Sequence, residues 1–337
     1  MDYHNKARLE YDAVLHLQNG KYTLLAKQTM KKQTATKPIL ALGLTPALQK
    51  ILFFDKFTPG DVNRAVRVET HAGGKASNLA MALAVLGDKA YVGGFNGGTA
   101  GRLAAADVTA RGAIPAFTKI NAETRTCSSI VDLAKGSVTE LVQEFPAVTD
   151  DDLARFTRKM LALLPKCAGM TISGTLPKVF PQDSYIPFGT KATKLGIPWL
   201  IDSHKAPLLS ALPCRPTVAK LNRFELGQTF GEPVATEKDC IRLLGKITER
   251  GAEWALMTDG AAPAILFSPD GGLWKLTPEK LNKVASPIGS GDCTAAGIIH
   301  GLVHGMTVPD SVAYGLACGT ANAKSYVPAD FVRPPVA

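Results

Sequence analysis

Residues 285–297 read ASPIGSGDCTAAG, a stretch in which glycines and a serine surround one aspartate before a run of small residues. Gly289 and Gly291 allow backbone conformations that other residues avoid, and they permit the close approach of a ligand. After Asp292 the chain carries apolar residues on one helical face, at 298, 302 and 303. The stretch therefore predicts a glycine-rich turn that opens a helix with Asp292 in its first turn. Such a turn binds anions, although an aspartate at this place is also a common helix cap.

A second glycine cluster occurs at residues 71–87, which read HAGGKASNLAMALAVLG. Gly73 and Gly74 bring the backbone close to a neighbouring group, Lys75 offers a cation, and Asn78 lies one turn into the helix that follows. A tight turn with a solvated lysine is the alternative interpretation. The cluster does not decide between them by itself.

Composition limits the function classes. The chain has 337 residues, of which 46% are hydrophobic, and no apolar run of about eighteen residues, so we expect no membrane partner. The first residues show neither an apolar signal core nor the acid-free pattern of a transit peptide. Six cysteines are scattered without a C-x-x-C pair, which favours reduced thiols in a cytoplasmic protein over disulfides or a zinc site. Cys293 is expected to be a small buried thiol rather than a nucleophile.

The formal charge is +9, and part of the excess lies in residues 1–37, where seven basic residues stand against three acidic ones. No basic run is interleaved with aromatic residues, so we expect no nucleic-acid partner, and the charge suits an anionic small substrate. Residues 1–37 are expected to form an N-terminal extension with a β-hairpin around Asn19-Gly20. The main domain is expected over residues 38–337.

From residue 38 onward, strand and helix patterns alternate. Strands are expected at 38–46, 168–173, 198–202, 217–220, 254–258 and 263–268, and helices at 76–86, from 150, from 236 and twice near the C-terminal end. This alternation predicts an α/β fold with a doubly wound, mostly parallel sheet flanked by helices, which binds ligands at the carboxyl ends of its strands. Residues 125–145 contain two extended segments around Lys135-Gly136-Ser137 and predict a small antiparallel β lid.

The two glycine clusters, GGKASN at 73–78 and PIGSGD at 287–292, resemble the signature regions of the ribokinase-like (PfkB) carbohydrate kinases. Further matches, in the family's order across about residues 38–327, are TPALQ at 45–49, VNR at 62–64, TR at 124–125, ISGTLP at 172–177, K-x-N-x-x-E at 220–225, T-x-G at 258–260 and the helix containing Asn322. Three of these elements (VNR, TR and ISGTLP) are similar to the branch that phosphorylates sugar phosphates. Its substrates are fructose-1-phosphate, fructose-6-phosphate and tagatose-6-phosphate.

The resemblance implies a ribokinase-like fold and an ATP-dependent phosphotransferase that uses Mg²⁺. Asp292 is then the base for the attacking hydroxyl, and an anion hole is formed by the N–H groups of Gly289, Ser290, Gly291 and Asp292. Substrate-binding positions are Gln49, Gly74, Lys75, Asn78, Arg125 and Ser173, with Arg125 gripping the substrate phosphate. Nucleotide-side positions are Lys220, Asn222, Thr258, Gly260 and Asn322, and the positions that act on Mg²⁺ are Asn222 and Glu225. A homodimer through the lid is one assembly that the resemblance allows.

Several positions depart from the family pattern. Gln49 stands in place of an aspartate, Ala76 in place of a glycine, and Met81 in place of an arginine common in the sugar-phosphate branch; on the nucleotide side, Leu221 replaces Pro and Pro263 replaces Gly. The phosphoryl-transfer residues are intact, so we interpret the chain as an active kinase of a phosphorylated hexose. A kinase of an unphosphorylated sugar or nucleoside, which needs no phosphate fork, and a non-catalytic sugar-phosphate sensor are the alternatives.

Overall fold

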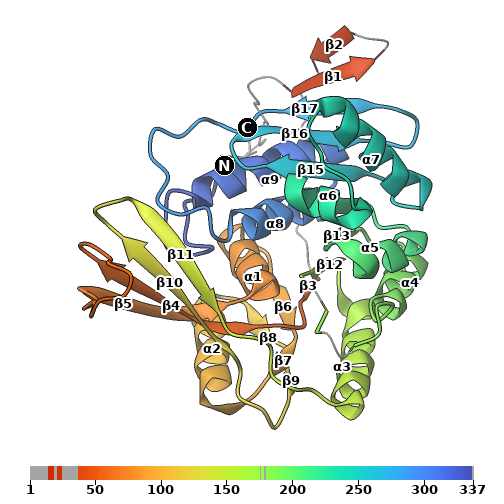
Figure 1. The fold of residues 1–337 in the computed structure, drawn as a ribbon. Helices are drawn as coiled ribbons and strands as arrows, with labels where there is room; N and C mark the ends of the chain where they lie inside the picture. Colours follow the sequence, from red (N-terminus) through yellow and green to blue (C-terminus); the bar gives the residue numbers. More distant parts are fainter. Residues whose placement is uncertain (1–13, 19–20, 25–36, 175, 178–179, 336–337) are drawn as a thin grey trace, which may run out of the picture.

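The computed structural model describes residues 14–18, 21–24, 37–174, 176–177 and 180–335. Its main sheet has eleven strands in the order β2-β1-β17-β16-β15-β14-β13-β12-β3-β6-β8 (Figure 1). Seven neighbouring strands run parallel, namely β15 (Ala255–Asp259), β14 (Val218–Asn222), β13 (Trp199–Asp202), β12 (Gly169–Ser173), β3 (Ile39–Leu42), β6 (Ala90–Gly93) and β8 (Ile114–Pro115). The predicted parallel core is therefore confirmed.

The other edge of this sheet is antiparallel. It consists of β16 (Ala262–Phe267), β17 (Leu273–Leu276), β1 (Val14–Gln18) and β2 (Lys21–Leu24). Strands β1 and β2 pair with each other, and β1 also pairs with β17, so the N-terminal segment extends the main sheet. Asn19-Gly20 lies outside the described residues, and the domain boundary at residue 38 stays a prediction.

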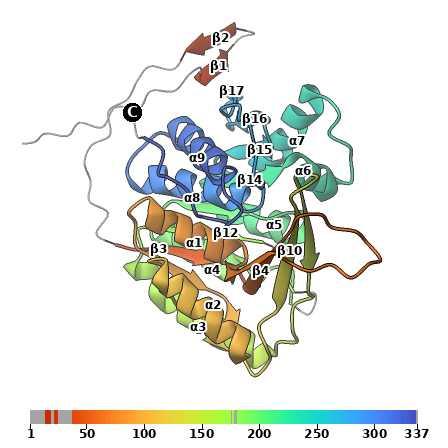
Figure 2. The ribbon, with the colours of Figure 1, turned by 90° about the vertical axis from the view of Figure 1, so that its left-hand side faces the viewer.

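Helices cover both faces of the main sheet. One face carries α1 (Lys75–Val85), α2 (Gly98–Ala110), α8 (Ser290–Val303) and α9 (Val308–Asn322), of which α1, α8 and α9 lie together in Figure 2. The opposite face carries α3 (Asp150–Leu163), α4 (Ile186–Lys194), α5 (Lys205–Ala211), α6 (Arg223–Phe230) and α7 (Glu237–Glu249). Strand β3 shows why two cores form, because Ile39 and Ala41 pack into the first and Leu40 and Leu42 into the second.

Two of these helices begin close to the predicted positions 150 and 236, each directly after a threonine that caps it. The Thr149 side chain accepts a hydrogen bond from the Asp152 N–H, and the Asp152 carboxylate accepts one from the Thr149 N–H in return. Thr236 and Asp239 form the same reciprocal pair at the start of α7. Such pairs satisfy N–H groups that lack partners within the helix.

A separate four-stranded sheet forms the lid, which projects to the left in Figure 1. Its order is β11 (Ser137–Val142), β10 (Thr126–Asp132), β4 (Ala47–Phe54) and β5 (Arg67–Gly73). The predicted small sheet is present, but β4 and β5 add two strands, and the central β10–β4 pairing is parallel. The expected strand over 38–46 ends at Leu42, and a turn leads into the lid.

The remaining elements are short. Two-residue strands β7 (Phe95–Asn96) and β9 (Thr118–Lys119) pair with each other, and single 3₁₀ turns follow α3 and α5 at Leu164–Lys166 and Leu212–Cys214. Among the helices of the described ranges, none has the length and apolar character needed to cross a bilayer.

Candidate active site

The glycine-rich turn at residues 287–292 opens α8, as predicted. Gly289 is the residue before the helix, and its φ of 79° lies in the left-handed region that favours glycine. A Cβ atom at this position would lie 2.7 Å from the Cβ of Pro328. Both observations make glycine a requirement at this turn.

The N–H groups of this turn point to an anion site. Ser290 is the exception, because its N–H already donates to the Pro287 carbonyl over 3.1 Å. The hydrogen bonds among the described residues use none of the N–H groups of Gly289, Gly291 and Asp292. Three donors at the positive end of a helix dipole therefore remain for an anion.

Asn322, predicted on the nucleotide side, holds this turn from inside the protein. Its Nδ2 donates to the Ile288 carbonyl (2.9 Å) and to Ser290 Oγ (3.1 Å). Its Oδ1 accepts from the Ala329 N–H (2.8 Å) and from the Cys293 thiol (3.3 Å). Because Asn322 and Cys293 are fully buried, we assign Asn322 to positioning the turn rather than to contacting a ligand.

Asp292 and Asn78 meet where the first turns of α8 and α1 face each other. Asn78 Nδ2 donates to Asp292 Oδ2 over 2.8 Å, and both side chains are buried. Burial raises the pKa of the Asp292 carboxyl to about 6, although Lys75 and the Asn78 hydrogen bond oppose this effect. Asn78 Oδ1 is also buried and has no partner among the described residues. The pair thus combines a carboxylate that is more basic than usual with an amide oxygen that accepts no hydrogen bond from the described residues.

A network of charged side chains lies beside this pair. Asp202 accepts from Lys75 Nζ (2.8 Å) and from Lys220 Nζ (2.6 Å), and Lys75 Nζ lies 3.5 Å from Glu225 Oε1. Burial alone would lower the pKa of Lys75, but the carboxylates of Asp202 and Glu225 raise it above its usual value. Lys220 Nζ lies 3.6 Å from the place of a Cβ on Gly291. The network therefore sets an ammonium group next to the anion turn.

Sequence reasoning missed Asp202, the centre of this network. Its carboxyl is almost fully buried, and although burial opposes ionisation, Lys220 and Lys75 lower the pKa of Asp202 below its usual value. Asp202 ends β13 and lies in register with Lys220 on β14. The available signal was an aspartate at the carboxyl end of an apolar strand.

The other predicted substrate residues lie near the N-terminus of α1. Gly74 has a φ of 95°, and a Cβ there would lie 3.0 Å from the Thr45 carbonyl oxygen. Ser173 Oγ is buried without a partner among the described residues. A narrow pocket brings these residues together, and its lining is Gly43, Thr45, Pro46, Gly74, Lys75, Ala76, Ser77 and Ser173.

Gln49 and Arg125 belong to the lid, and Arg125 contacts a residue that lines this pocket. Gln49 Nε2 donates to Ser129 Oγ over 2.8 Å inside the lid sheet. The guanidinium of Arg125 donates to the Thr45 carbonyl (3.0 Å) and to the Gln143 carbonyl (3.4 Å). Arg125 therefore reaches a wall of the pocket, although two of its nitrogens already serve the backbone.

A cavity of about 330 Å³ lies on the other side of the anion turn. Thr258 and Gly260 line it as predicted for a nucleotide site, and Ser290 and Gly291 connect it to the turn. Its further walls include the apolar residues Leu281, Val284 and Leu316. A mostly apolar cavity that ends at an anion site suits a base attached to phosphates.

Asn222 and Glu225 form a reciprocal cap at the start of α6. Asn222 Oδ1 accepts from the Glu225 N–H and Glu225 Oε2 accepts from the Asn222 N–H, both over 2.8 Å. The second carboxylate oxygen, Oε1, faces Lys75. Because one oxygen of the Glu225 carboxylate is already used in the cap, these residues fit a magnesium ion bound through water molecules better than one bound directly.

The sequence profile of the pfkB family carbohydrate kinases matches residues 39–331. The chain belongs to the pfkB family. As a member of it, the chain is an ATP-dependent sugar kinase.

Solved structures share the fold of this kinase. Phosphofructokinase-2 from Escherichia coli, in complex with potassium, is 22% identical with a TM-score of 0.80, over 88% of this chain and 95% of that one. A possible 1-phosphofructokinase from Thermotoga maritima is 22% identical with a TM-score of 0.76, over 85% and 92%. Arabidopsis thaliana ribokinase, complexed with ribose and ATP, is 17% identical with a TM-score of 0.68, over 89% and 96%.

Two departures of this kinase from the family pattern have a structural explanation. The Cβ of Ala76 lies 2.6 Å from the place of a Cβ on Gly43, so a glycine at 43 accommodates the alanine at 76. Met81 is fully buried in the core beneath α1, where an apolar side chain fits and an arginine would be buried. Leu221 is likewise a core residue, and Pro263 is half-buried in β16.

Proposed function

We propose that this kinase transfers the γ-phosphoryl group of ATP to a hydroxyl of a phosphorylated hexose, with Asp292 as the general base. The observation that carries the proposal is the position of a buried carboxylate in the same helical turn as three N–H groups without acceptors. A base and an anion site in one turn are what in-line phosphoryl transfer requires.

In the proposed reaction, the substrate hydroxyl gives its proton to Asp292 while its oxygen forms a bond to the γ-phosphorus. The bond between this phosphorus and the bridging oxygen of ATP breaks, and ADP leaves with the electron pair. Asn78 fixes one carboxylate oxygen of Asp292, which leaves Oδ1 for the hydroxyl. Because burial places the pKa of Asp292 at about 6, the group is ionised at neutral pH and more basic than an exposed aspartate.

Backbone N–H groups and a lysine would stabilise the negative charge that develops on the transferred phosphoryl group. The N–H groups of Gly289, Gly291 and Asp292 would donate to its oxygens, and Lys220 lies beside Gly291. Preorganised donors of this kind act strongly in a water-poor site. Mg²⁺ would neutralise the phosphates of ATP, and Glu225 with Asn222 would hold its water ligands.

The sugar would lie at the N-terminus of α1, next to the narrow pocket that Gly74 and Ser173 line. Two buried acceptor or donor atoms there, Asn78 Oδ1 and Ser173 Oγ, lack partners among the described residues and would pair with sugar hydroxyls. Arg125 would bind the phosphate, and Gln49 and Lys75 the adjacent groups. An unphosphorylated sugar or nucleoside is the second candidate, because Arg125 already donates to two backbone carbonyls.

We also propose a homodimer through the lid. Strands β5 and β11 expose apolar side chains, of which Val68, Leu141 and Val142 are more than half exposed. Sedimentation of the wild type and of Leu141→Lys tests this assembly. A wild type that sediments as a monomer would contradict it.

The test of the proposed function is an ADP-release screen with MgATP over phosphorylated and plain hexoses, pentoses and nucleosides. We expect the highest kcat/KM for a ketohexose phosphate, with no release above background in Asp292→Asn. A plain sugar or nucleoside as the best substrate would support the second candidate. ADP release that is equal in the two proteins would contradict the role of Asp292.

A further inference from the structure

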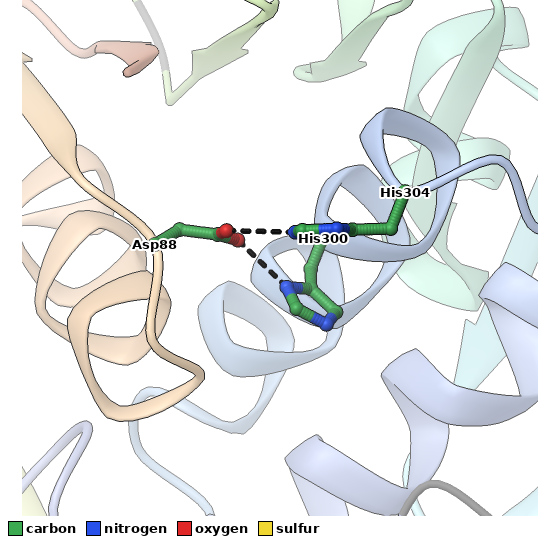
Figure 3. A group of neighbouring side chains, drawn as sticks. All are labelled: Asp88, His300 and His304. Carbon is green, nitrogen blue, oxygen red and sulfur yellow. Dashed lines mark hydrogen bonds and ion pairs between the residues drawn. The ribbon is translucent and has the colours of Figure 1, made fainter. Parts of the chain in front are cut away.

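Three side chains that the kinase reaction does not use meet at the far end of α8. His300 lies in the last turn of this helix, His304 is the residue directly after its end at Val303, and Asp88 follows α1 (Figure 3). His300 Nδ1 lies 2.6 Å from Asp88 Oδ2, and His304 Nε2 lies 2.8 Å from Asp88 Oδ1. Two imidazole nitrogens thus converge on one carboxylate, eight residues or about 12 Å along the helix from Asp292.

The donor set is that of a transition-metal site. His300 and His304 are four residues apart at the end of α8, and their ring centroids lie 4.4 Å from each other. Two histidines with a carboxylate form a ligand set found around zinc. The three ligand atoms lie within 4.8 Å of one another. Ligands at about 2.0–2.2 Å from a metal are at most about 4.4 Å apart, so a small rotation of the side chains brings all three into range.

The burial of the cluster also suits metal binding. The Asp88 and His300 side chains are almost fully buried, whereas His304 is 13% exposed and gives access from solvent.

The charges around the cluster favour the binding of a cation, and the imidazole ligands favour a transition-metal ion. Helix α1 ends at Val85 and α8 at Val303, so two helix C-termini direct partial negative charge toward this place. Arg333 contributes an opposing positive charge near His300. An ion that binds imidazole strongly, such as Zn²⁺, therefore suits the cluster better than Mg²⁺ or Ca²⁺ does.

We propose that Asp88, His300 and His304 form a binding site for a divalent transition-metal ion of the Zn²⁺ type, separate from the kinase site. The bound ion would tie the C-terminal end of α1 to that of α8. These two helices carry Asn78 and Asp292 at their opposite ends, so the site would brace the pair of helices that builds the catalytic centre.

Equilibrium dialysis of the full-length protein against Zn²⁺ tests this site. We expect about one Zn²⁺ per chain in the wild type, and binding weakened at least about 100-fold in Asp88→Asn and in His304→Gln, since even partners outside the ligand shell contribute 10–100-fold. Zn²⁺ should also raise the Tm of the wild type and leave that of His304→Gln unchanged. His304 is partly exposed, so its substitution is the milder change if Asp88→Asn fails to fold.

Two matched controls exclude other binding places. His71 lies 3.5 Å from Glu69, and Cys214 is the cysteine that is only half-buried, so His71→Gln and Cys214→Ser should bind Zn²⁺ as the wild type does. Equal binding by the wild type and both cluster variants would overturn the proposal. So would a wild type that binds no Zn²⁺ but loses stability on His304→Gln, because the cluster would then be a hydrogen-bonded clamp only.

Discussion

Replacing Asn78 with leucine should move the pH dependence of the kinase toward alkaline pH. In the wild type, Asn78 Nδ2 donates to the ionised Asp292 over 2.8 Å, and this bond lowers the pKa of Asp292 from the value that burial alone would give. A hydrogen bond to a charged group contributes about 1.5–3 kcal/mol, and about 1.4 kcal/mol corresponds to one pH unit. The base acts when deprotonated, so the acid limb should move from about pH 6 to roughly pH 7–8.

The assay is kcat/KM for the best sugar substrate between pH 5 and 9, since this ratio reports groups of the free enzyme. Ser173→Ala is the matched control, because it truncates another buried polar group of the site without contacting Asp292. Its acid limb should stay near that of the wild type even if kcat/KM falls. An acid limb that is equally placed in Asn78→Leu and the wild type would refute the reasoning.

Three further substitutions test other contacts. Arg125→Ala should raise KM for a sugar phosphate about 10- to 100-fold with little change in KM for ATP; equal effects in initial-rate kinetics would make Arg125 a structural residue of the lid. Asp202→Asn should lower the free energy of unfolding by about 3–5 kcal/mol in urea titrations, because Lys220 would be buried without its partner; an unchanged midpoint would show that Lys220 finds another one. Gln49→Asp should lower kcat/KM on the best substrate, because it buries a carboxylate and removes the donor to Ser129; a raised kcat/KM on fructose-6-phosphate would show that the ordinary family contact was restored.

Local sequence signals predicted the parts of the fold that depend on neighbouring residues. The turn before α8 follows from two glycines around Ser290, and α3 and α7 begin at threonines with an acidic residue three positions later. The lid strands β4 and β5 were missed because β4 buries residues on both faces, so ALQKILFF shows no alternation. The parallel pairing of β10 with β4 joins residues nearly eighty positions apart, and no local pattern reports it.

In the candidate site, too, features that depend on local sequence were predicted and features that depend on long-range pairing were not. Asp292 and Asn78 were predicted from their own motifs, whereas Asp202 depends on the register of β13 against β14, which sets it opposite Lys220. The hydrogen bond from the Ser290 N–H to the Pro287 carbonyl, which closes the turn, was likewise not predicted. These contacts depend on strand register or on the geometry of a turn, so the spacing of residues in the sequence does not predict them.

The central claim, that Asp292 removes the proton from the attacking hydroxyl, is tested most directly by Asp292→Asn. Asparagine keeps the shape and the bond partner Asn78 but has no basic oxygen. Single-turnover rates with saturating MgATP and sugar should fall by about 10²–10⁴-fold, while the Kd values of both ligands stay near those of the wild type. A single-turnover rate within a few-fold of the wild type would contradict the claim and remove Asp292 from the chemical step.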